Sequence, residues 1–463
     1  MNQLKQAVPS LRVVELFAGV GGFRQGLTAV ETTGPTPAFD VVWSNQFEPD
    51  CKKQHAASVY RARWGEDGFV NRDINAVLAD RTAMAELDAL QPNMLVGGFP
   101  CQDYSVALPS NRSEGLQGKK GVLWWSIHKM VQARQHAGKP FEYLMLENVD
   151  RLINSPSNCR GRDFAVILST LQGLGYAVEW RVVNSADYGF PQRRKRTFIL
   201  AYHRSTALYA RLRSAAGISQ ATTWMTETGP FGKALPAEIK GKDTLTVFPL
   251  SSDILQTQER YAPVQGLSCF ESAGICIEGK VSTVPLRAHI PTDFESYVGQ
   301  RAAMTLGDVT STTCGVDAEY FLNDEQLARW EYLKGPKAIE RMSASGFTYT
   351  YKEGALAFPD HLDKPARTII TSEGGRSASR TSHVVRDIDG RLRRLTPEEL
   401  EALNGFPRGF TSVPGIPAGK RAFMMGNALV TGIVRLLGTA LAEAHCAAWP
   451  DSEYCSVIAL KQA

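Results

Sequence analysis

Short apolar runs alternate with helical patterns through the first two hundred residues, and this rhythm constrains the fold more than any other feature. The apolar runs lie at 13–17, 41–43, 94–96, 143–146 and 196–201. The helical patterns between them cover 23–30, 50–63, 80–89 and 123–137. Strands that alternate with helices predict a doubly wound, mostly parallel sheet of the α/β class.

The rhythm is lost from about residue 202 to 371, where Gly, Pro, Ser and Thr punctuate the chain irregularly. Two later helices are predicted by their caps, one after Asn323 with Gln326 at capping-box spacing, and one at Thr396-Pro397. A long apolar helix is expected over 429–445. We predict a main domain formed by residues 1–201 and 421–463, and a smaller, irregular, β-rich domain over 202–420.

The composition is that of a soluble globular protein, with 43% apolar and 21% charged residues among 463. The sequence holds no run of eighteen apolar residues and no apolar signal core at its start, so we expect neither a membrane span nor secretion. Its eight cysteines form no CxxC pair, so neither a zinc cluster nor a disulfide framework is predicted, and a reducing cytoplasm fits best. A net charge of +4 permits nucleic-acid binding without demanding it.

A glycine-rich turn follows the first predicted strand, in the segment Glu15-Leu-Phe-Ala-Gly-Val-Gly-Gly-Phe. Gly19, Gly21 and Gly22 allow the backbone to approach a ligand closely, and the N–H groups of the next helix would face that ligand. The spacing is not GxGxxG, and no Gly-Lys-Ser/Thr follows. An adenosyl cofactor is therefore favoured over a dinucleotide or a nucleoside triphosphate, with a ligand-free tight turn as the alternative.

Acidic residues at the end of a second strand usually hold ribose hydroxyls. Here Gln46 stands at that place and Glu48 follows two residues later, so either residue could serve. Asp73-Ile74 ends the next unit, where a carboxylate could accept from an adenine amino group. For Asp73, a helix N-cap is an equally good interpretation.

Cys101 lies just beyond a buried strand, in the turn Gly98-Phe-Pro-Cys-Gln. That place is the carboxyl edge of an open α/β sheet, where ligands bind, and Pro100 stiffens the approach. A lone cysteine is usually a small buried hydrophobe. Its position after the strand instead indicates a nucleophile.

Two further polar segments flank predicted strands. Glu147-Asn148 ends one strand; a buried glutamate needs a partner, so it is either a cap or a carboxyl group that holds a proton. Gln192 precedes a basic run that enters the last strand, where Arg194 and Arg196 share a face. Guanidinium groups at a sheet edge near a carboxylate suit phosphate or base contacts.

Taken in order, five segments resemble the cytosine-5 DNA methyltransferase family: 15–23, 100–102, 147–149, 192–196 and 426–429. The resemblance implies a Rossmann-like methyltransferase fold that uses S-adenosylmethionine, releases S-adenosylhomocysteine, and requires no metal. It also implies double-stranded DNA as the substrate, with the target base turned out of the helix. The region over 202–357 then resembles the family's target-recognition region.

The resemblance implies roles for individual residues. Cys101 would attack C6 of the cytosine, Glu147 would hold N3 and the exocyclic amine, and Arg194 and Arg196 would support the base. The cofactor would be lined by Phe17, Ala18, Gly19, Gly21, Gly22, Gln46, Glu48, Asp73, Ile74, Pro100 and Asn427. Contacts with DNA would come from Gln102, Ser105 and Gln192.

Two departures from the family pattern stand out. Gln46 occupies the place where the family often has glutamate, which leaves the ribose contact open between Gln46 and Glu48. Leu429 replaces the valine that often ends the last segment.

We expect a sequence-specific enzyme of a restriction–modification or defence system, acting in the cytoplasm, with a cognate nuclease or defence proteins as possible partners. A tRNA methyltransferase of the same fold is the first alternative, disfavoured by the long middle region. A non-catalytic DNA-binding protein is disfavoured by the intact set of Cys101, Glu147 and the arginines. A Rossmann dehydrogenase is disfavoured by the glycine spacing.

Overall fold

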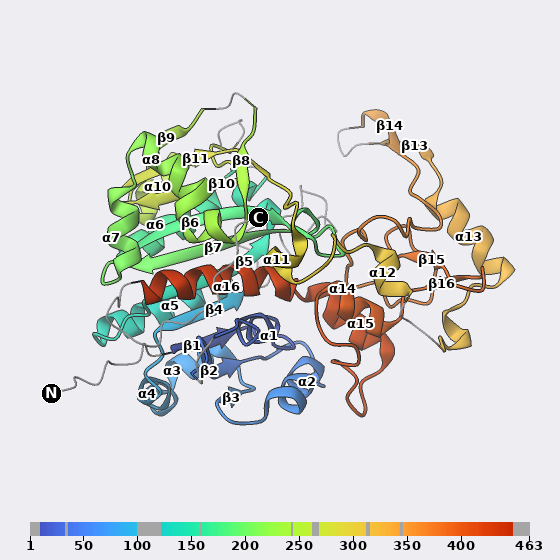
Figure 1. Ribbon diagram of the computed structural model, residues 1–463, viewed down its shortest axis with the longest axis horizontal. Helices are drawn as coiled ribbons and strands as arrows, with labels where there is room; N and C mark the ends of the chain where they lie inside the picture. The colour runs from blue at the N-terminus through green and yellow to red at the C-terminus, as the bar shows by residue number, and fades with distance from the viewer. Residues whose placement is uncertain are drawn as a thin grey trace. The chain divides into compact units, whose positions relative to one another are not determined.

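The computed structural model describes residues 10–32, 36–99, 122–157, 159–241, 244–261, 268–311, 315–342 and 346–447. The chain forms two compact units, and Figure 1 shows their elements. Unit 1 comprises residues 1–189, 195–302 and 431–463, and unit 2 comprises 190–194 and 303–430. Residues 195–302 belong to unit 1, so these compact units divide the chain differently from the predicted domains, which stay a prediction.

A ten-stranded mixed sheet forms the centre of unit 1, in the order β3-β2-β1-β4-β5-β7-β6-β10-β11-β9. Its first half is parallel: β3 Phe69–Val70, β2 Phe39–Asn45, β1 Leu11–Leu16, β4 Met94–Gly98 and β5 Tyr143–Val149. Its second half is antiparallel: β7 Lys195–His203, β6 Tyr176–Asn184, β10 Ala273–Ile277, β11 Lys280–Val284 and β9 Thr246–Pro249. The four runs predicted within β1, β2, β4 and β5 are confirmed as parallel strands, and the run at 196–201 lies within the antiparallel β7.

Helices pack against this sheet and bury its apolar side chains. The longer ones are α2 His55–Trp64, α4 Arg81–Ala89, α5 Val122–His136, α6 Arg162–Gly173, α7 Ala207–Ser214 and α16 Thr431–Cys446. The shorter ones are α1 Gly22–Leu27, α3 Ile74–Ala79, α8 Ile218–Thr223, the π-helix η5 Trp224–Thr228, α9 Pro230–Ala234, α10 Ile254–Arg260 and α11 Phe294–Val298, with 3₁₀ turns η3 Asp150–Asn154 and η4 Ser185–Tyr188. A separate ribbon pairs β8 Ala237–Ile239 with β12 Leu286–Ala288.

Strand β4 is central to this core because both its neighbours are parallel and its side chains are almost all buried. Leu95, Trp124 and Leu146 share one cluster beneath the sheet with fully buried side chains of α5 and α6. Continuous apolar strands of this kind are typical of a parallel sheet covered on both faces. The closely packed core therefore holds the carboxyl ends of β1, β4 and β5 in fixed positions.

Unit 2 contains helices and short ribbons. Its elements are α12 Leu306–Thr310, η6 Ala318–Tyr320, α13 Asp324–Lys334, β13 Lys337–Met342, β14 Thr348–Glu353, β15 Val384–Arg386, β16 Leu392–Arg394, α14 Pro397–Leu403 and α15 Ala418–Asn427. Both predicted caps are confirmed: Asn323 and Gln326 form a capping box before α13, and Thr396 does so with Glu399 before α14.

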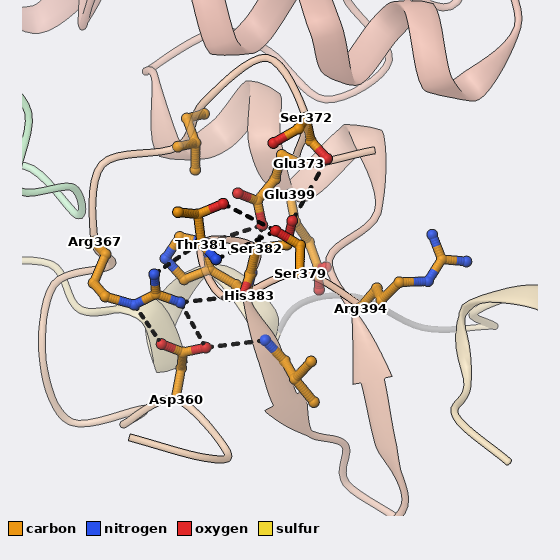
Figure 2. A network of polar contacts seen from close by, with 12 residues as sticks. Asp360, Arg367, Ser372, Glu373, Ser379, Thr381, Ser382, His383, Arg394 and Glu399 are labelled. Atoms are coloured by element: carbon orange, nitrogen blue, oxygen red, sulfur yellow. Dashed lines mark hydrogen bonds and ion pairs between the residues drawn. The ribbon is translucent and has the colours of Figure 1, made fainter. Parts of the chain in front are cut away.

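A buried polar network holds the irregular segment between β14 and β16 together (Figure 2). The guanidinium of Arg367 donates to both oxygens of Asp360, at 2.9 and 3.2 Å, and Asp360 accepts the Val384 N–H at 3.0 Å. Glu373 accepts from Nδ1 of His383 at 2.9 Å and from the backbone N–H of the same residue. These side-chain bonds supplement the short β15–β16 pairing in holding this stretch together.

Two features of the C-terminal region bear on earlier expectations. The span Ala418–Cys446 is long and apolar enough to cross a membrane by length and composition alone. However, 72% of the apolar 18-residue window within it is buried inside the protein, as in a core helix. Cys446, at the end of α16, takes part in a disulfide bond, which the sequence analysis did not predict.

Candidate active site

The glycine-rich turn between β1 and α1 has a backbone that few residues adopt. Phe17 has φ of 54° and Gly19 has φ of 58°, both in the left-handed region. A non-glycine residue held there stores conformational strain, and such strain is common at functional sites. A Cβ added at Gly19 would meet nothing within 4 Å, so the turn opens onto free space at this point.

Backbone N–H groups of the turn are bound within the protein, which differs from the expectation that they face a ligand. Ala18 donates to the Asn45 carbonyl at 3.0 Å, and Gly19 donates to Oε1 of Gln46 at 2.7 Å. The N–H of Arg24, in the first turn of α1, donates to Oε1 of Glu15 at 3.2 Å. The turn therefore offers space and shape to a ligand, whereas these donors brace the loop.

Gln46 and Glu48 have distinct surroundings at the end of β2. Gln46 is buried, its side chain accepts from Gly19, and its carbonyl accepts from Nδ2 of Asn71 at 2.5 Å. Glu48 is half-buried, and the side-chain amide of Gln54 binds both its backbone N–H and its carbonyl, at 2.8 and 2.7 Å. Two amide side chains thus fix the backbone of this segment.

Glu15 is a fully buried carboxyl group that the sequence analysis quoted only as part of the loop. Its Oε2 accepts from the Tyr60 hydroxyl at 3.0 Å, and its Oε1 accepts from the Arg24 N–H. Burial raises the pKa of Glu15 to about 7, although both of these hydrogen bonds oppose the shift. The signal that could have identified it is a glutamate inside the apolar run Val-Val-Glu-Leu-Phe, which requires buried partners.

Asp73 is the N-cap of α3, so the cap interpretation is confirmed. Its Oδ1 accepts from the N–H groups of Asn75 and Ala76, at 2.8 and 3.3 Å. Ile74, the first residue of the helix, is buried. Both cap bonds end on Oδ1, and the predicted contact of Asp73 with an adenine amine stays a prediction.

Glu147 and Arg196 form an ion pair at the carboxyl end of β5, with 2.8 Å between Oε1 and Nε. Both side chains are mostly buried, at 14% and 17% exposure. Gly98 lies in register with Glu147 on the neighbouring strand, and a Cβ added there would lie 3.2 Å from Oε2 of Glu147. The glycine therefore leaves room for the carboxyl group, which is held by an arginine on one side.

Asn148 connects this carboxyl group to the segment that contains the predicted nucleophile. Its Nδ2 donates to the Phe99 carbonyl at 3.3 Å, and its side chain is almost completely buried. The sequence predicted no role for Asn148, although an amide side chain at the end of an apolar strand was a signal that could have indicated one.

Four predicted site residues lie outside the described part of the chain: Pro100, Cys101, Gln102 and Ser105.

The remaining predicted residues belong to unit 2. Arg194 is buried, and its guanidinium donates to the carbonyls of Ile369 and Gly426 at 3.0 and 2.9 Å. Gln192 is completely buried and bonds with Asn404 and with the Ile369 N–H. Its side chain is fully buried, and its predicted DNA contact stays a prediction.

Asn427 ends α15 with an exposed side chain, directly after Gly426. A Cβ at Gly426 would lie 2.4 Å from the backbone of Ile370, so only glycine fits where these two segments approach each other. The arginine bond and the glycine contact together place the segment that precedes Asn427. Its predicted cofactor contact stays a prediction.

Two solved structures share the fold of this chain. A solved methyltransferase of Entamoeba histolytica, EhMeth, matches with a TM-score of 0.53 and 13% identity over 94% of this chain and 98% of that one. The Dnmt2 methyltransferase of S. pombe matches with a TM-score of 0.51 and 14% identity, over 94% and 98%. These likenesses show the fold.

Sequence relatives are closer. The chain is 40% identical to Type II methyltransferase M.Sau3AI of Staphylococcus aureus, over 92% of this chain and 94% of that protein. It is 33% identical to Type II methyltransferase M.NgoBI of Neisseria gonorrhoeae, over 43% of this chain and 52% of that protein. The model of the C-5 cytosine-specific DNA methylases matches residues 11–443. The chain belongs to the C-5 cytosine-specific DNA methylase family.

Proposed function

We propose that this chain transfers a methyl group from S-adenosylmethionine to C5 of a cytosine that has been turned out of double-stranded DNA. One observation carries the assignment of the site: the Glu147–Arg196 pair lies in register with Gly98, three residues before Cys101. In the sequence, a connection of two residues leads from Phe99 to Cys101. The Asn148 bond to Phe99 holds the start of that connection beside Glu147.

The residues at the glycine turn fit an adenosyl cofactor. The left-handed backbone of Phe17 and the open space beside Gly19 leave room for a ligand close to the backbone. Phe17, Ala18, Gly21, Gly22, Ile74, Pro100 and Asn427 complete the predicted lining. When bound, S-adenosylmethionine supplies a methyl group on a positively charged sulfur. The proposed methyl transfer requires no metal ion.

The chain's own groups account for the proton and electron movements. The Cys101 thiolate adds to C6, and the ring electrons shift towards N3, which takes a proton from Glu147. C5 thereby becomes a nucleophilic enamine carbon and bonds to the methyl group. Loss of the C5 proton to a base then restores the C5–C6 double bond, the Sγ–C6 bond breaks, and the N3 proton returns to Glu147. Arg196 keeps the Glu147 carboxyl aligned throughout.

Glu48 is our choice for the ribose contact, and Gln46 is a positioning residue. The Gln46 side-chain oxygen accepts from the Gly19 N–H, so this residue fixes the turn. Glu48 follows at the same strand end, on a backbone that Gln54 holds in place. A carboxylate at this place can accept from both ribose hydroxyls.

Glu48→Gln is therefore expected to weaken binding of S-adenosylmethionine by roughly 10- to 100-fold, because charge-assisted hydrogen bonds become neutral ones. Titration calorimetry without DNA measures this directly. Gln46→Glu is the matched variant: its carboxylate still accepts from Gly19, so affinity should stay close to wild type. If Gln46→Glu instead bound S-adenosylmethionine weakly and Glu48→Gln bound it as tightly as wild type, the ribose contact would belong to residue 46.

Biological context follows from the relatives' names. They are Type II methyltransferases, so we infer a restriction–modification role in the cytoplasm, with a cognate nuclease recognising the same DNA sequence. The DNA family, together with the 40% identical relative over almost the whole length, disfavours the alternatives of a tRNA enzyme and a non-catalytic scaffold.

Bisulfite sequencing of DNA from cells that express the chain tests the function as a whole. We expect protected cytosines at one short recurring sequence, absent from cells with the empty vector. Complete conversion of every cytosine in DNA from cells that contain soluble chain would contradict the proposal.

A further inference from the structure

Two segments of unit 1 leave the same edge of the sheet after the parallel strands β2 and β3. The first, residues 46–51, contains Glu48, and the second, residues 71–73, ends at Asp73, the N-cap of α3. Strand β3 has only two residues, so its backbone pairing with β2 is short. Three amide side chains also join the two segments, and we call this set the amide relay: Asn45, Gln54 and Asn71.

Gln54 uses both polar atoms of its amide on the first segment. Its Oε1 accepts the N–H of Glu48 at 2.8 Å, and its Nε2 donates to the carbonyls of Glu48 and Cys51, both at 2.7 Å. The amide thus binds the N–H and the C=O of one residue, as a neighbouring strand would. Gln54 itself lies directly before α2, whose inner residues are buried, so Glu48 is held from a firmly packed element.

Asn71 carries the connection to the second segment. Its Nδ2 donates to the Gln46 carbonyl at 2.5 Å and to Oε1 of Gln54 at 3.3 Å. One oxygen therefore accepts from Glu48 and from Asn71, which uses both of its lone pairs. A displacement of either segment breaks a bond that also serves the other.

Asn45 holds the second segment from β2. Its side chain is only 2% exposed, and its Nδ2 donates to the carbonyls of Val70 and Arg72 at 3.1 and 2.8 Å. These carbonyls belong to the residues on either side of Asn71, and Arg72 directly precedes Asp73. The hydrogen bonds therefore run without interruption from Glu48 to the residue before Asp73.

The two ends of this connection are the residues expected at the two parts of an adenosyl group. A binding site whose contacts are fixed before the ligand arrives avoids the entropic cost of ordering them. We propose that the amide relay positions the cofactor: it couples Glu48, at the ribose, to Asp73, at the adenine, so that adenosine meets a preformed site. This inference rests on the proposed function and deepens it. Asn45, Gln54 and Asn71 are then positioning residues that act through the two contact residues.

Binding of S-adenosylmethionine, measured by titration calorimetry without DNA, tests the coupling. Gln54→Ala and Asn71→Ala should each weaken binding by roughly 10-fold, because each removes bonds from the same network. The double variant should lose roughly 10- to 20-fold, instead of the roughly 100-fold expected for independent residues, since either substitution already interrupts the relay. Gln132→Ala, which removes a half-buried amide from α5, is the matched control and should bind as wild type does.

Two further measurements separate positioning of the cofactor from a general structural role. Binding of 5′-methylthioadenosine, which lacks the amino-acid part of the cofactor, should weaken by the same factor as binding of S-adenosylmethionine. In methylation assays, the KM for S-adenosylmethionine should rise in both single variants, while kcat at saturating cofactor stays close to wild type. Thermal unfolding midpoints without cofactor report whether each variant is folded. If Gln54→Ala is unfolded, Gln54→Glu replaces it with the same expected loss, because its carboxylate oxygen faces two carbonyls that have lost their donor.

The outcomes keep the two proposals apart. If wild type neither binds S-adenosylmethionine nor methylates DNA, the proposed function fails. If wild type binds the cofactor and the folded single variants bind it within about twofold of wild type, the relay inference is overturned and the proposed function stands. Losses that multiply in the double variant also overturn it, since Gln54 and Asn71 then act independently. A fall in kcat at unchanged affinity does so too, because it assigns these amides to the chemical step.

Discussion

Cys101→Ser is expected to abolish methyl transfer, with the largest effect of any single substitution in this chain. A serine hydroxyl is a far weaker nucleophile than a thiolate, so it does not add to C6 of the cytosine, and C5 then remains unreactive towards a sulfonium methyl group. Serine is close to cysteine in size, so the substitution should leave the fold unchanged. Cofactor affinity, measured without DNA, should therefore match wild type.

A covalent trap makes this prediction specific to the nucleophile. In a duplex with 5-fluorocytosine at the target, the fluorine cannot leave as a cation, so the adduct between Sγ and C6 persists. Wild type should give a chain–DNA complex that survives denaturation, and Cys101→Ser should give none. Cys51→Ser is the control, because Cys51 is an exposed free cysteine on another loop. Methylation by Cys101→Ser, or a trap lost equally in both variants, would contradict the assignment.

The parallel half of the sheet could be predicted because its strands carry their own signal. β4 is an apolar run that ends in glycine, and apolar runs also mark β1 and β5, although β1 contains Arg12 and Glu15. Each predicted helix between these strands is present. The helix caps could be predicted equally well, because Asn323 and Thr396 each form a capping box with the residue three positions later in the sequence. Local chemistry of this kind needs no tertiary information.

Apart from β7, which the apolar run at 196–201 predicted, the antiparallel half could not be predicted, because its pairing depends on distant segments. β10 adds to β6 nearly a hundred residues away, and its own hairpin turns through Glu278-Gly279, both with positive φ, instead of the Asn-Gly or Asp-Gly that signals such a turn. β6 also pairs through buried Glu179 and Arg181, charged residues that mask its strand pattern.

In the candidate site, the sequence predicted which residues take part, but it did not predict their hydrogen-bond partners. Motif order indicated Glu147 and Arg196, and their ion pair is found. No pattern indicated that Gln46 would bind the Gly19 N–H, because that bond joins two strands twenty-seven residues apart. The same holds for Arg194 and Gln192, whose basic and polar character suggested contact with DNA, while their bonds are to buried groups of unit 2.

Glu147→Gln is expected to slow methyl transfer by roughly 10²- to 10⁴-fold, the usual contribution of a group that exchanges a proton in the transition state. The amide has the size and the acceptor oxygen of the carboxyl group, so it can still accept from Arg196 and from the exocyclic amine. It cannot donate a proton to N3 and take it back. The loss should therefore appear in the rate at saturating DNA and cofactor, with little change in the KM for either.

Glu142→Gln is the matched control, because Glu142 precedes β5 at its opposite end and is partly buried as well. Single-turnover methylation and the rate of 5-fluorocytosine trapping should both fall in Glu147→Gln, since addition of sulfur to C6 already requires the proton at N3. A near-wild-type rate, or equal losses in the two variants, would remove Glu147 from the mechanism. A slow methylation rate with fast trapping would instead place its proton after the addition step, so the two measurements together locate the step in which this carboxyl group acts.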